Sequence, residues 1–334
     1  MKKKRVGVLM GGGNAEHEVS LCTGEGIAAA LEARGHDVVR VVCGSAETAG
    51  AGIDELVRRA NLDTVFIALH GSGGEDGCVQ GLLEILGIPY TGSNVVASAL
   101  AMDKVKAKEL FRLHNVPTPP YYVIDAAQRG ASLEELTELH GTFGFPSVVK
   151  PRSEGSSVGL TVVNSASQLG EAIDLALSFN GCALVERYVK AMEVQVGVVD
   201  GKAIGGIEVV PKSGLYDYKA KYTAGETEYF VPPRLPETRL LGVLNIAERA
   251  VAAIGCTGVV RVDMLVTEGG NEYVLEVNTL PGFTATSLIP KIAAKNGTSY
   301  GDLCETILAG AKLHSRLKEP KPAPVIAPIA ARTS

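Results

Sequence analysis

The chain has 334 residues, of which 46% are hydrophobic and 21% are charged, and its formal net charge is −5. This composition is typical of a folded protein with two or three domains, and its scattered Lys and Arg residues lack the basic stripe that would predict nucleic-acid binding. No apolar run approaches 18 residues, and the run after the basic start ends within five residues at Gly11. We therefore expect neither a membrane span nor a signal peptide.

The cysteines stand singly, without CxxC pairs or a neighbouring His at zinc spacing. This pattern predicts a reducing, cytoplasmic compartment and argues against a structural metal held by thiolates. The cysteines are Cys22, Cys43, Cys78, Cys182, Cys256 and Cys304.

Residues 1–93 alternate strand-like and helix-like patterns, which predicts a small α/β domain with a parallel sheet. The expected elements are a strand at 6–10, a helix at 16–34, strands at 38–42 and 64–69, and a helix at 79–86. The loop 70–77 directly follows a strand, at the edge where such sheets place ligands. His70 and Glu75 in this loop could equally be structural.

We place a second domain at 94–185, a third at 186–317 and a tail at 318–334. The tail holds four prolines without periodicity, and we expect it to be disordered. The second domain is expected to contain a helix at 102–114 and strands at 147–150 and 160–163. For the third we expect strands at 184–187, 194–199, 203–210, 259–266 and 273–277, and a helix at 239–254.

Two stretches could bind phosphate. A strand ends at Lys150 and leads into the Gly- and Ser-rich loop 152–159, whose backbone N–H groups and hydroxyls could hold an anion. A plain hairpin loop explains the same residues, and Lys104 is equally ambiguous as a single helix residue. The loop lacks the GxxxxGK[ST] pattern, and the glycines at 11–13 fail GxGxxG because Glu16 fills the last position.

Residues 259–278 form the most informative stretch, two alternating runs joined by Gly269 and Gly270. This pattern predicts a hairpin with a two-residue turn. Asp263 then faces Glu276, and Arg261 faces Asn278, all on one face because side chains alternate along a strand. The other face is apolar and fit for burial, with Val262, Met264, Val266, Tyr273, Leu275 and Val277.

Directly opposed carboxylates repel each other unless a positive charge lies between them. The oxygens of Asp263, Glu276 and Asn278 suit a hard cation such as Mg²⁺, which keeps some waters and binds substrate phosphates. Arg261 beside them could stabilise an oxyanion. An exposed polar sheet face is the alternative explanation. The long polar segment 212–230, rich in tyrosine, is the candidate for a closing lid.

Ordered motifs from residue 6 to about 312 resemble the D-alanine–D-alanine ligase family of the ATP-grasp class. They are Gly11-Gly12, Ala15-Glu16, Glu18-Val19-Ser20, His70-Gly71, Gly74-Glu75-Asp76-Gly77, Tyr90-Thr91-Gly92, Met102-Asp103-Lys104, Lys150-Pro151, Glu154-Gly155-Ser156-Ser157-Val158-Gly159, Tyr216-Asp217-Tyr218, Ala220-Lys221-Tyr222, Glu276-Val277-Asn278-Thr279 and Pro281-Gly282.

The resemblance implies a three-domain α/β fold, with α+β parts, that encloses ATP between two sheet-based domains. It implies an ATP-dependent ligase that joins two D-alanine molecules through a D-alanyl phosphate, for peptidoglycan precursor synthesis, and a homodimer. The alternatives are a ligase that makes D-alanyl-D-lactate and a non-catalytic nucleotide-binding protein. Lys221 and Tyr222 discriminate the first, and damaged metal or lysine positions, which are not seen, would favour the second.

The resemblance also implies roles for single positions. Those implied for the amino acids and the oxyanion are Glu16, His70, Glu75, Ser156, Tyr222, Arg261, Gly282, Ser287 and Leu288. Those implied for ATP are Lys104, Lys150, Ser157, Glu186, Arg187, Glu193 and Lys221, where Arg187 stands in place of a common Lys. Those implied for two Mg²⁺ ions, with Mn²⁺ as the alternative, are Asp263, Glu276 and Asn278.

Overall fold

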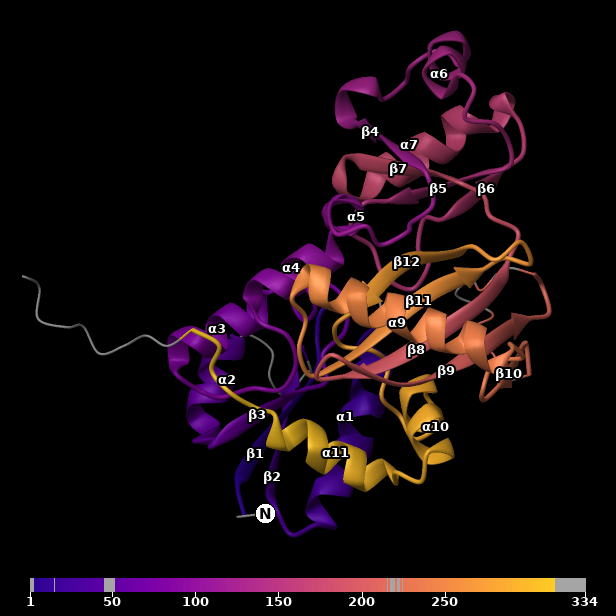
Figure 1. The fold of residues 1–334 in the computed structure, drawn as a ribbon. Coiled ribbons are helices and arrows are strands. Elements are labelled where there is room, and N and C mark those ends of the chain that lie inside the picture. Colours follow the sequence, from indigo (N-terminus) through magenta and orange to yellow (C-terminus); the bar gives the residue numbers. More distant parts are fainter. Residues whose placement is uncertain are drawn as a thin grey trace, which may run out of the picture.

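The computed structural model describes residues 3–14, 16–44, 52–214, 216, 220, 223 and 225–315. Within them the chain forms one parallel and two antiparallel sheets with helices packed on their faces, so the expected mixed α/β class is confirmed. Figure 1 shows the sheets stacked along the molecule, with the parallel sheet at one end and the four-stranded sheet at the other. The predicted tail at 318–334 lies outside the described residues.

The parallel sheet has the order β2-β1-β3. Its central strand is buried along nearly its whole length, as expected for a strand with neighbours on both sides and helices on its faces. The elements of this part are β1 (Arg5–Gly11), α1 (His17–Glu32), β2 (Asp37–Cys43), α2 (Ile53–Ala60), β3 (Thr64–Ile67) and α3 (Cys78–Leu86). The expected strands and helices of residues 1–93 therefore form, and α2 is an addition to them.

The four-stranded antiparallel sheet has the order β4-β7-β5-β6. The strand expected at 184–187 in the third domain pairs here with β4 and β5, so its assignment to the other sheet was wrong. The elements are β4 (Tyr121–Asp125), η2 (Ala126–Gln128), α6 (Leu133–His140), β5 (Ser147–Pro151), β6 (Thr161–Val163), η3 (Ala166–Gln168), α7 (Leu169–Asn180) and β7 (Cys182–Arg187).

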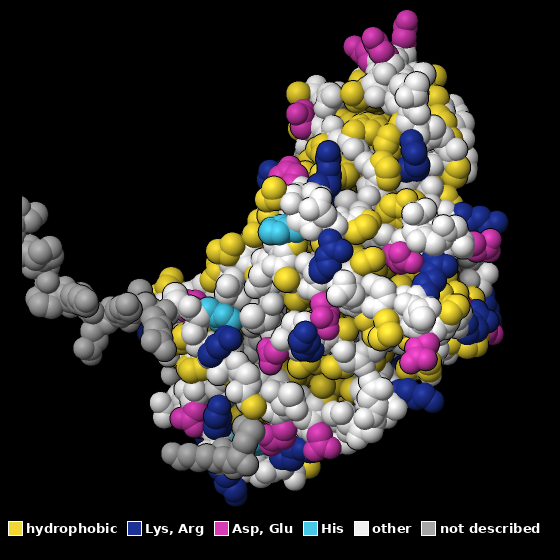
Figure 2. Space-filling model, viewed as in Figure 1, with side chains coloured by type: hydrophobic (Ala, Val, Ile, Leu, Met, Phe, Trp, Pro, Cys, Tyr) yellow, Lys and Arg dark blue, Asp and Glu magenta, His cyan; other side chains and the backbone are white. Residues whose placement is uncertain are grey.

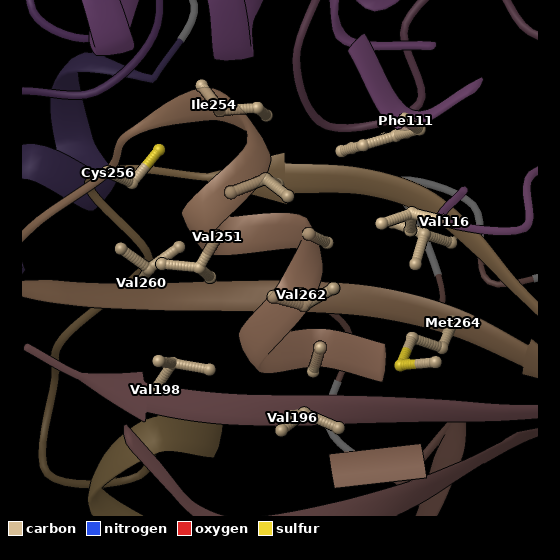
Figure 3. Close-up of a cluster of buried hydrophobic side chains, with 14 of the residues drawn as sticks. Phe111, Val116, Val196, Val198, Val251, Ile254, Cys256, Val260, Val262 and Met264 are labelled. Carbon is tan, nitrogen blue, oxygen red and sulfur yellow. The ribbon is translucent and has the colours of Figure 1, made fainter. Parts of the chain in front are cut away.

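The five-stranded antiparallel sheet has the order β10-β9-β8-β11-β12, and α9 covers one of its faces (Figure 1). Figure 3 shows the core beneath α9, where valines of β8 and β11 meet the helix and Phe111. The elements are β8 (Met192–Val199), β9 (Lys202–Pro211), β10 (Thr227–Phe230), α9 (Glu237–Ile254), β11 (Val259–Val266) and β12 (Glu272–Asn278).

The single helix expected at 102–114 is two helices, α4 (Val95–Met102) and α5 (Lys104–Leu113). Asp103 separates them because its carboxylate accepts hydrogen bonds from the backbone N–H groups of Val105 and Lys106, at 3.1 and 3.0 Å. An N-cap of this kind starts a new helix. Both helices share the hydrophobic core of the five-stranded sheet.

The last described helices are α10 (Leu288–Lys295), which packs onto β8 and β9, and α11 (Tyr300–Ala309), which packs onto α1. No helix among the described residues is both long and apolar enough to span a membrane. On the face drawn in Figure 2, Lys and Arg side chains are interspersed with Asp and Glu over most of the surface.

Candidate active site

The hairpin of β11 and β12 brings four of the predicted site residues together. Asp263 pairs with Glu276, and Arg261 pairs with Asn278, as the sequence predicts. Asp263 is 4% exposed, and Glu276 is partly buried. The two opposed carboxylates therefore lie in a largely water-excluded place, where their mutual repulsion is strong unless cations compensate it.

The turn of this hairpin differs from the expected two-residue turn. Thr267 faces Asn271, whose carbonyl oxygen accepts the Thr267 backbone N–H at 2.9 Å, so residues 268–270 form the tip. Gly270 has a φ of +86°, which is unfavourable for residues with a side chain, so glycine is required at this point. The longer turn shifts the pairing of the strands by one residue.

A β-bulge at Leu275 restores the predicted pairing. Met264 pairs with Val274, whereas the next pair along is Asp263 with Glu276, so Leu275 is the additional residue of β12. Val274 is fully buried in the core, while Leu275 lines the cavity beside Glu276. The expectation that Tyr273 and Leu275 share the buried face was therefore wrong, and Val274 takes that place.

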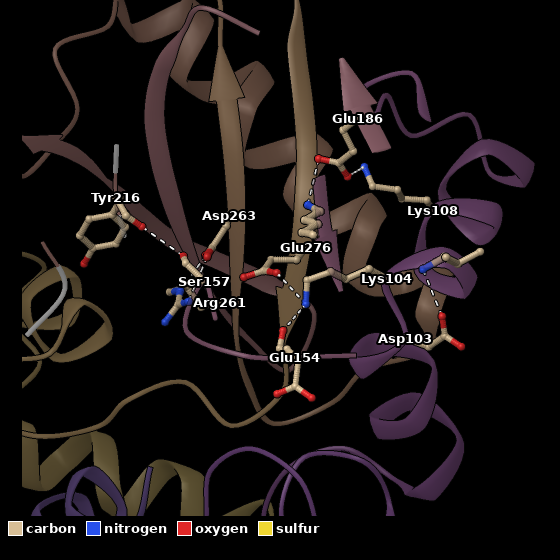
Figure 4. A network of polar contacts seen from close by, with 12 residues as sticks. Asp103, Lys104, Lys108, Glu154, Ser157, Glu186, Tyr216, Arg261, Asp263 and Glu276 are labelled. Atoms are coloured by element: carbon tan, nitrogen blue, oxygen red, sulfur yellow. Dashed lines mark hydrogen bonds and ion pairs between the residues drawn. The ribbon is translucent and has the colours of Figure 1, made fainter. Parts of the chain in front are cut away.

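Arg261 compensates one carboxylate and Lys104 the other (Figure 4). The guanidinium donates to both oxygens of Asp263, at 2.7 and 2.9 Å. Burial alone would lower the pKa of Arg261, but the attraction of Asp263 outweighs it and raises the pKa. The Lys104 ammonium lies 3.5 Å from Glu276 and donates to the Glu154 carbonyl oxygen at 2.5 Å. Each carboxylate thus faces a cation of its own.

A cavity of about 400 Å³ lies between the four-stranded and the five-stranded sheets. Its wall carries both charged side chains and the apolar side chains of Val148, Leu265 and Leu275. The predicted site residues on its wall are Lys104, Lys150, Ser157, Glu186, Arg187, Glu193, Asp263 and Glu276. The structure therefore gathers in one cavity the described residues that were expected to bind ATP, together with two of the expected metal ligands.

Glu186 is shared by two lysines on one side of this cavity. Its carboxylate lies 2.9 Å from the Lys150 ammonium and 2.7 Å from that of Lys108. Burial alone would raise the pKa of Glu186, but the two lysines outweigh it and lower the pKa. Sequence reasoning missed Lys108, although its spacing of four residues from Lys104 on a helix was a usable signal.

Asp103 fixes the start of α5 against the phosphate-binding loop candidate. Arg152 donates to both Asp103 oxygens at 2.9 Å, and its carbonyl oxygen accepts the Lys104 backbone N–H at 3.0 Å. In the same loop, Ser157 donates to the Tyr216 carbonyl oxygen at 3.2 Å (Figure 4). These bonds hold Lys104 beside the loop 152–159.

A second cavity, of about 450 Å³, adjoins the first and shares Tyr216 and Glu276 with it. Its lining also includes Leu280, Pro281 and Gly282, which follow β12. The predicted site residues on its wall are Glu16, His70, Glu75, Ser156, Arg261, Gly282, Ser287, Leu288, Glu276 and Asn278.

Glu16 and Ser156 meet at this second cavity although they are 140 residues apart. The Ser156 hydroxyl donates to a Glu16 oxygen at 2.5 Å. A side chain at Gly71, where φ is +67°, would lie 2.7 Å from the other Glu16 oxygen, so glycine leaves room for the carboxylate. Asn14 accepts the Glu16 backbone N–H at 2.9 Å. The carboxylate is therefore fixed from two loops.

His70 is buried and Glu75 is partly buried beside Glu16, and the pKa of each is shifted toward the neutral form. Burial lowers the pKa of His70, whose Nδ1 donates to the Leu280 carbonyl oxygen at 3.1 Å while Nε2 accepts from Thr23 at 3.2 Å. Burial and the charge of Glu16 raise the pKa of Glu75 to about 8.

The far wall of the second cavity is the start of α10. Ser287 precedes the helix, and its hydroxyl oxygen accepts the Thr284 backbone N–H at 3.0 Å. Leu288, 9% exposed, begins the helix and packs against the core of β9. Gly282 lies opposite, where a side chain would come within 3.6 Å of the Ser287 hydroxyl.

Two predicted residues of the lid candidate, Lys221 and Tyr222, lie outside the described residues. Tyr216 from the same segment is described, and its phenol lies 3.3 Å from that of Tyr229. Burial raises the pKa of Tyr216, with a smaller contribution from Tyr229. Tyr216 therefore remains protonated where the two cavities meet.

The donors at the hairpin fit a hard cation only in part. Among the described residues, no three His, Cys, Asp or Glu side chains cluster at metal-binding distances. Asp263 and Glu276 are nonetheless opposed, and the buried Asn278 amide nitrogen has no hydrogen-bond partner among the described residues. Two carboxylates and an amide leave most of a cation's coordination shell open for phosphate oxygens and water.

Two family models match the chain. The N-terminal model of D-ala D-ala ligase matches residues 44–93, and the C-terminal model matches residues 110–309. A D-alanine–D-alanine ligase of Anaeromyxobacter dehalogenans strain 2CP-C is 51% identical over 93% of this chain and 97% of its own. One from Geobacter sulfurreducens is 48% identical over 94% of this chain and 96% of its own.

Solved structures agree in fold. The D-alanine–D-alanine ligase of Bacillus anthracis has a TM-score of 0.78 and 35% identity, over 91% of this chain and 96% of its own. The VanG D-Ala:D-Ser ligase of Enterococcus faecalis also has a TM-score of 0.78, at 27% identity over 92% of this chain and 99% of its own. The same enzyme of Bacillus anthracis has also been solved with ATP, with 32% identity and a TM-score of 0.77 over 92% of this chain and 96% of its own.

Proposed function

The chain belongs to the D-alanine–D-alanine ligase family, and on that premise we propose that it joins two molecules of D-alanine at the expense of ATP. The observation that carries the proposal is the pair of adjoining cavities that share Glu276. One is lined by lysines and carboxylates suited to a nucleotide, and the other by a fixed carboxylate and a partly buried arginine suited to amino acids. A phosphoryl group transferred between them would pass the β11–β12 hairpin.

ATP would occupy the first cavity. Lys104 and Lys150 would bind its phosphates through charge-assisted hydrogen bonds, and Ser157 would add a hydroxyl. Glu186, Arg187 and Glu193 also line this cavity, and they would contact the adenine and ribose. Lys221 stays part of this proposal from the sequence, as the lysine for the terminal phosphate.

Asp263, Glu276 and Asn278 would hold magnesium, or manganese, together with phosphate oxygens. The ions would supply positive charge that neutralises the phosphates during transfer. The opposed carboxylates give this assignment its support, because a cation between them would relieve their repulsion. Mg²⁺ titration followed by phosphate release tests it.

The first D-alanine would bind through its ammonium to Glu16, whose carboxylate is held by Ser156. Its own carboxylate oxygen would attack the terminal phosphorus of ATP, giving an acyl phosphate and ADP. The raised pKa of Glu75, about 8, keeps this carboxyl protonated at neutral pH, so it adds no second negative charge that would repel the attacking carboxylate.

The second D-alanine would lie toward Ser287 and Leu288, with its carboxylate at the start of α10. Its amine, after losing a proton, would attack the acyl carbon and expel phosphate. Arg261 and the backbone N–H of Gly282 would stabilise the oxyanion that forms. Water would hydrolyse the acyl phosphate, so we propose that segment 211–230, with Tyr222, closes over the site.

The test is phosphate release from ATP and Mg²⁺ with D-alanine, compared with L-alanine, D-serine and D-lactate as acceptors. The product with D-alanine should be D-alanyl-D-alanine. D-serine is included because the VanG D-Ala:D-Ser ligase has the same fold. No phosphate release with any of these acceptors would contradict a ligase and favour a non-catalytic nucleotide-binding protein.

We also propose that the enzyme works in the cytoplasm, in peptidoglycan precursor synthesis, with small molecules as its ligands. All six cysteines are free, as in proteins of a reducing compartment. The three domains, at 1–93, 94–185 and 186–317, stay part of the proposal, with ATP between the second and the third.

A homodimer completes the proposal. Ile85 at the end of α3 is 78% exposed and Val96 on the adjacent α4 is 64% exposed, a surface suited to a second copy. Sedimentation of the full chain should give the mass of a dimer. Val96→Glu should shift the equilibrium toward a monomer, and an unchanged mass would place the interface elsewhere.

A further inference from the structure

Lys108 is a fully buried lysine that lines neither cavity. It lies on α5, one turn after Lys104, and its ammonium pairs with Glu186 at 2.7 Å (Figure 4). The same ammonium donates to the Thr118 hydroxyl at 2.5 Å, which in turn donates to the Val274 carbonyl oxygen at 2.8 Å. A lysine is almost never fully buried unless it is paired, and here Glu186 is the partner.

The cluster of Lys108, Lys150 and Glu186 carries one positive charge in excess. Two ammoniums share a single carboxylate, at 2.7 and 2.9 Å, and all three side chains are at most 8% exposed. An uncompensated buried charge is unfavourable, so an anion that reaches the cluster is strongly stabilised. Of the two ammoniums, only that of Lys150 is on the cavity wall.

We propose that Lys108 is a positioning residue that neutralises Glu186 and thereby leaves the Lys150 ammonium available to a phosphate group. The inference rests on the proposed role of Lys150 as a phosphate ligand. Without Lys108, Lys150 and Glu186 would form a closed neutral pair. A phosphate would then have to compete with Glu186 for the only ammonium.

Burial lowers the pKa of Lys108 to about 8, against the opposing attraction of Glu186. This shows how strongly the surroundings disfavour a second positive charge. The charged groups that act on Lys108 are Glu186, Lys150 and, from β12, Glu276. Tyr121 adds its ring at 5.6 Å. The excess positive charge therefore belongs to Lys108, Lys150 and Glu186 together, and a bound phosphate group would neutralise it.

The decisive variant is Lys108→Met, measured with ADP as the probe by calorimetry and with ATP and D-alanine in steady-state kinetics. We expect ADP and ATP to bind about tenfold or more weakly, since one charge-assisted phosphate contact is lost. The KM for D-alanine should change by less than about twofold. Lys106→Met, an exposed lysine on the same helix, is the matched control and should leave all three values unchanged.

Further variants separate charge from packing. Glu186→Gln alone measures the loss that comes from the adenine side of Glu186. Combined with Lys108→Met it restores one excess positive charge, so the double variant should bind ADP more tightly than the product of the two single losses predicts. Additive weakening would show that Lys108 acts only as a structural link and would overturn the proposal. Thr118→Val removes the hydroxyl that connects Lys108 to β12, and an ADP loss equal to that of Lys108→Met would also overturn it.

Thermal unfolding of each variant shows whether it is folded. If Lys108→Met is unfolded, Lys108→Gln decides, because its amide can still donate to Glu186 without adding a charge. Unchanged ADP affinity in the folded variant would contradict the proposal. Lys150→Ala separates the failure of this inference from the failure of the proposed function. If Lys150→Ala leaves ADP affinity unchanged, the phosphate role of Lys150 is wrong. If Lys150→Ala weakens ADP binding and Lys108→Met does not, only the role of Lys108 is wrong.

Discussion

Asp263 and Glu276 face each other across β11 and β12, and each is bound from the side by a different cation. Arg261 holds both oxygens of Asp263, while Lys104 lies 3.5 Å from Glu276. Arg261 comes from the same strand as Asp263, whereas Lys104 comes from α5. Asp263 therefore has a close cationic partner on its own strand, whereas the cation nearest to Glu276 is more distant and comes from α5.

Glu276→Gln should abolish turnover and leave the fold nearly intact, because it removes a charge from a repelling pair and a candidate metal ligand. Phosphate release with D-alanine and saturating Mg²⁺ is the measurement. Unfolding without Mg²⁺ should show unchanged or higher stability. Near-normal phosphate release in this variant would contradict the metal assignment.

Lys150→Ala should weaken ATP binding by several-fold or more, since a charge-assisted hydrogen bond contributes roughly 1.5–3 kcal/mol. D-alanine affinity should change little. The matched control is Lys202→Ala, a lysine whose side chain is 83% exposed. Calorimetric titration with ADP measures the loss, and equal losses for both ligands would place Lys150 outside the nucleotide site.

The sequence predicted the pairing of Asp263 with Glu276 correctly, although not for the reason assumed. The turn is one residue longer than expected, and the bulge at Leu275 restores the register. Alternation of side chains predicts which residues share a face. A bulge depends on how the two strands pair, and a short sequence pattern does not contain that information. The polar face was therefore predictable, and the inward-facing residues near the turn were not.

Other features depend on contacts between distant segments, which a single sequence does not contain. Glu16 meets Ser156 from 140 residues away, and Lys108 meets Glu186 on β7. The break at Asp103 was visible as a capping residue, but the helix pattern on either side concealed it. Motif resemblance pointed to candidate residues on the walls of both cavities. The charge balance around Glu186 could not be predicted, because its partners come from separate elements that only the fold brings together.

Ser156→Ala should lower kcat/KM for D-alanine by roughly ten- to a hundredfold, because the Glu16 carboxylate loses the hydrogen bond that the Ser156 hydroxyl donates to it. The KM for ATP should change little. Ser157→Ala is the contrasting neighbour, since its side chain lines the nucleotide cavity, and it should act mainly on ATP. Steady-state kinetics with each substrate varied in turn distinguish the two, and the reverse pattern would exchange their assignments.

Glu75→Gln should make the protein more stable at pH 8–9 while changing it little at pH 5. Burial raises the pKa of Glu75 to about 8 from its ordinary value of 4.5, so the folded protein keeps a proton that the unfolded chain loses. The stability of the parent therefore falls as pH rises from 4.5 to 8, by at most about 1.4 kcal/mol per pH unit. Urea unfolding at pH 5, 7 and 8.5 measures this, and parallel curves for both proteins would refute a Glu75 that stays protonated in the folded state.

Val274→Ala and Leu275→Ala form a matched pair that tests the bulge. Val274 is fully buried beneath α9, so its truncation should lower the free energy of unfolding by about 1–3 kcal/mol with little effect on ATP. Leu275 lines the nucleotide cavity beside Leu265, so its truncation should leave stability nearly unchanged and raise the KM for ATP several-fold through lost apolar contact.

A hairpin without the bulge would bury Leu275 and expose Val274, which reverses both expectations. Urea unfolding and ATP kinetics on the two variants therefore decide between the registers, and Val262→Ala, buried on β11 in either register, calibrates the stability loss.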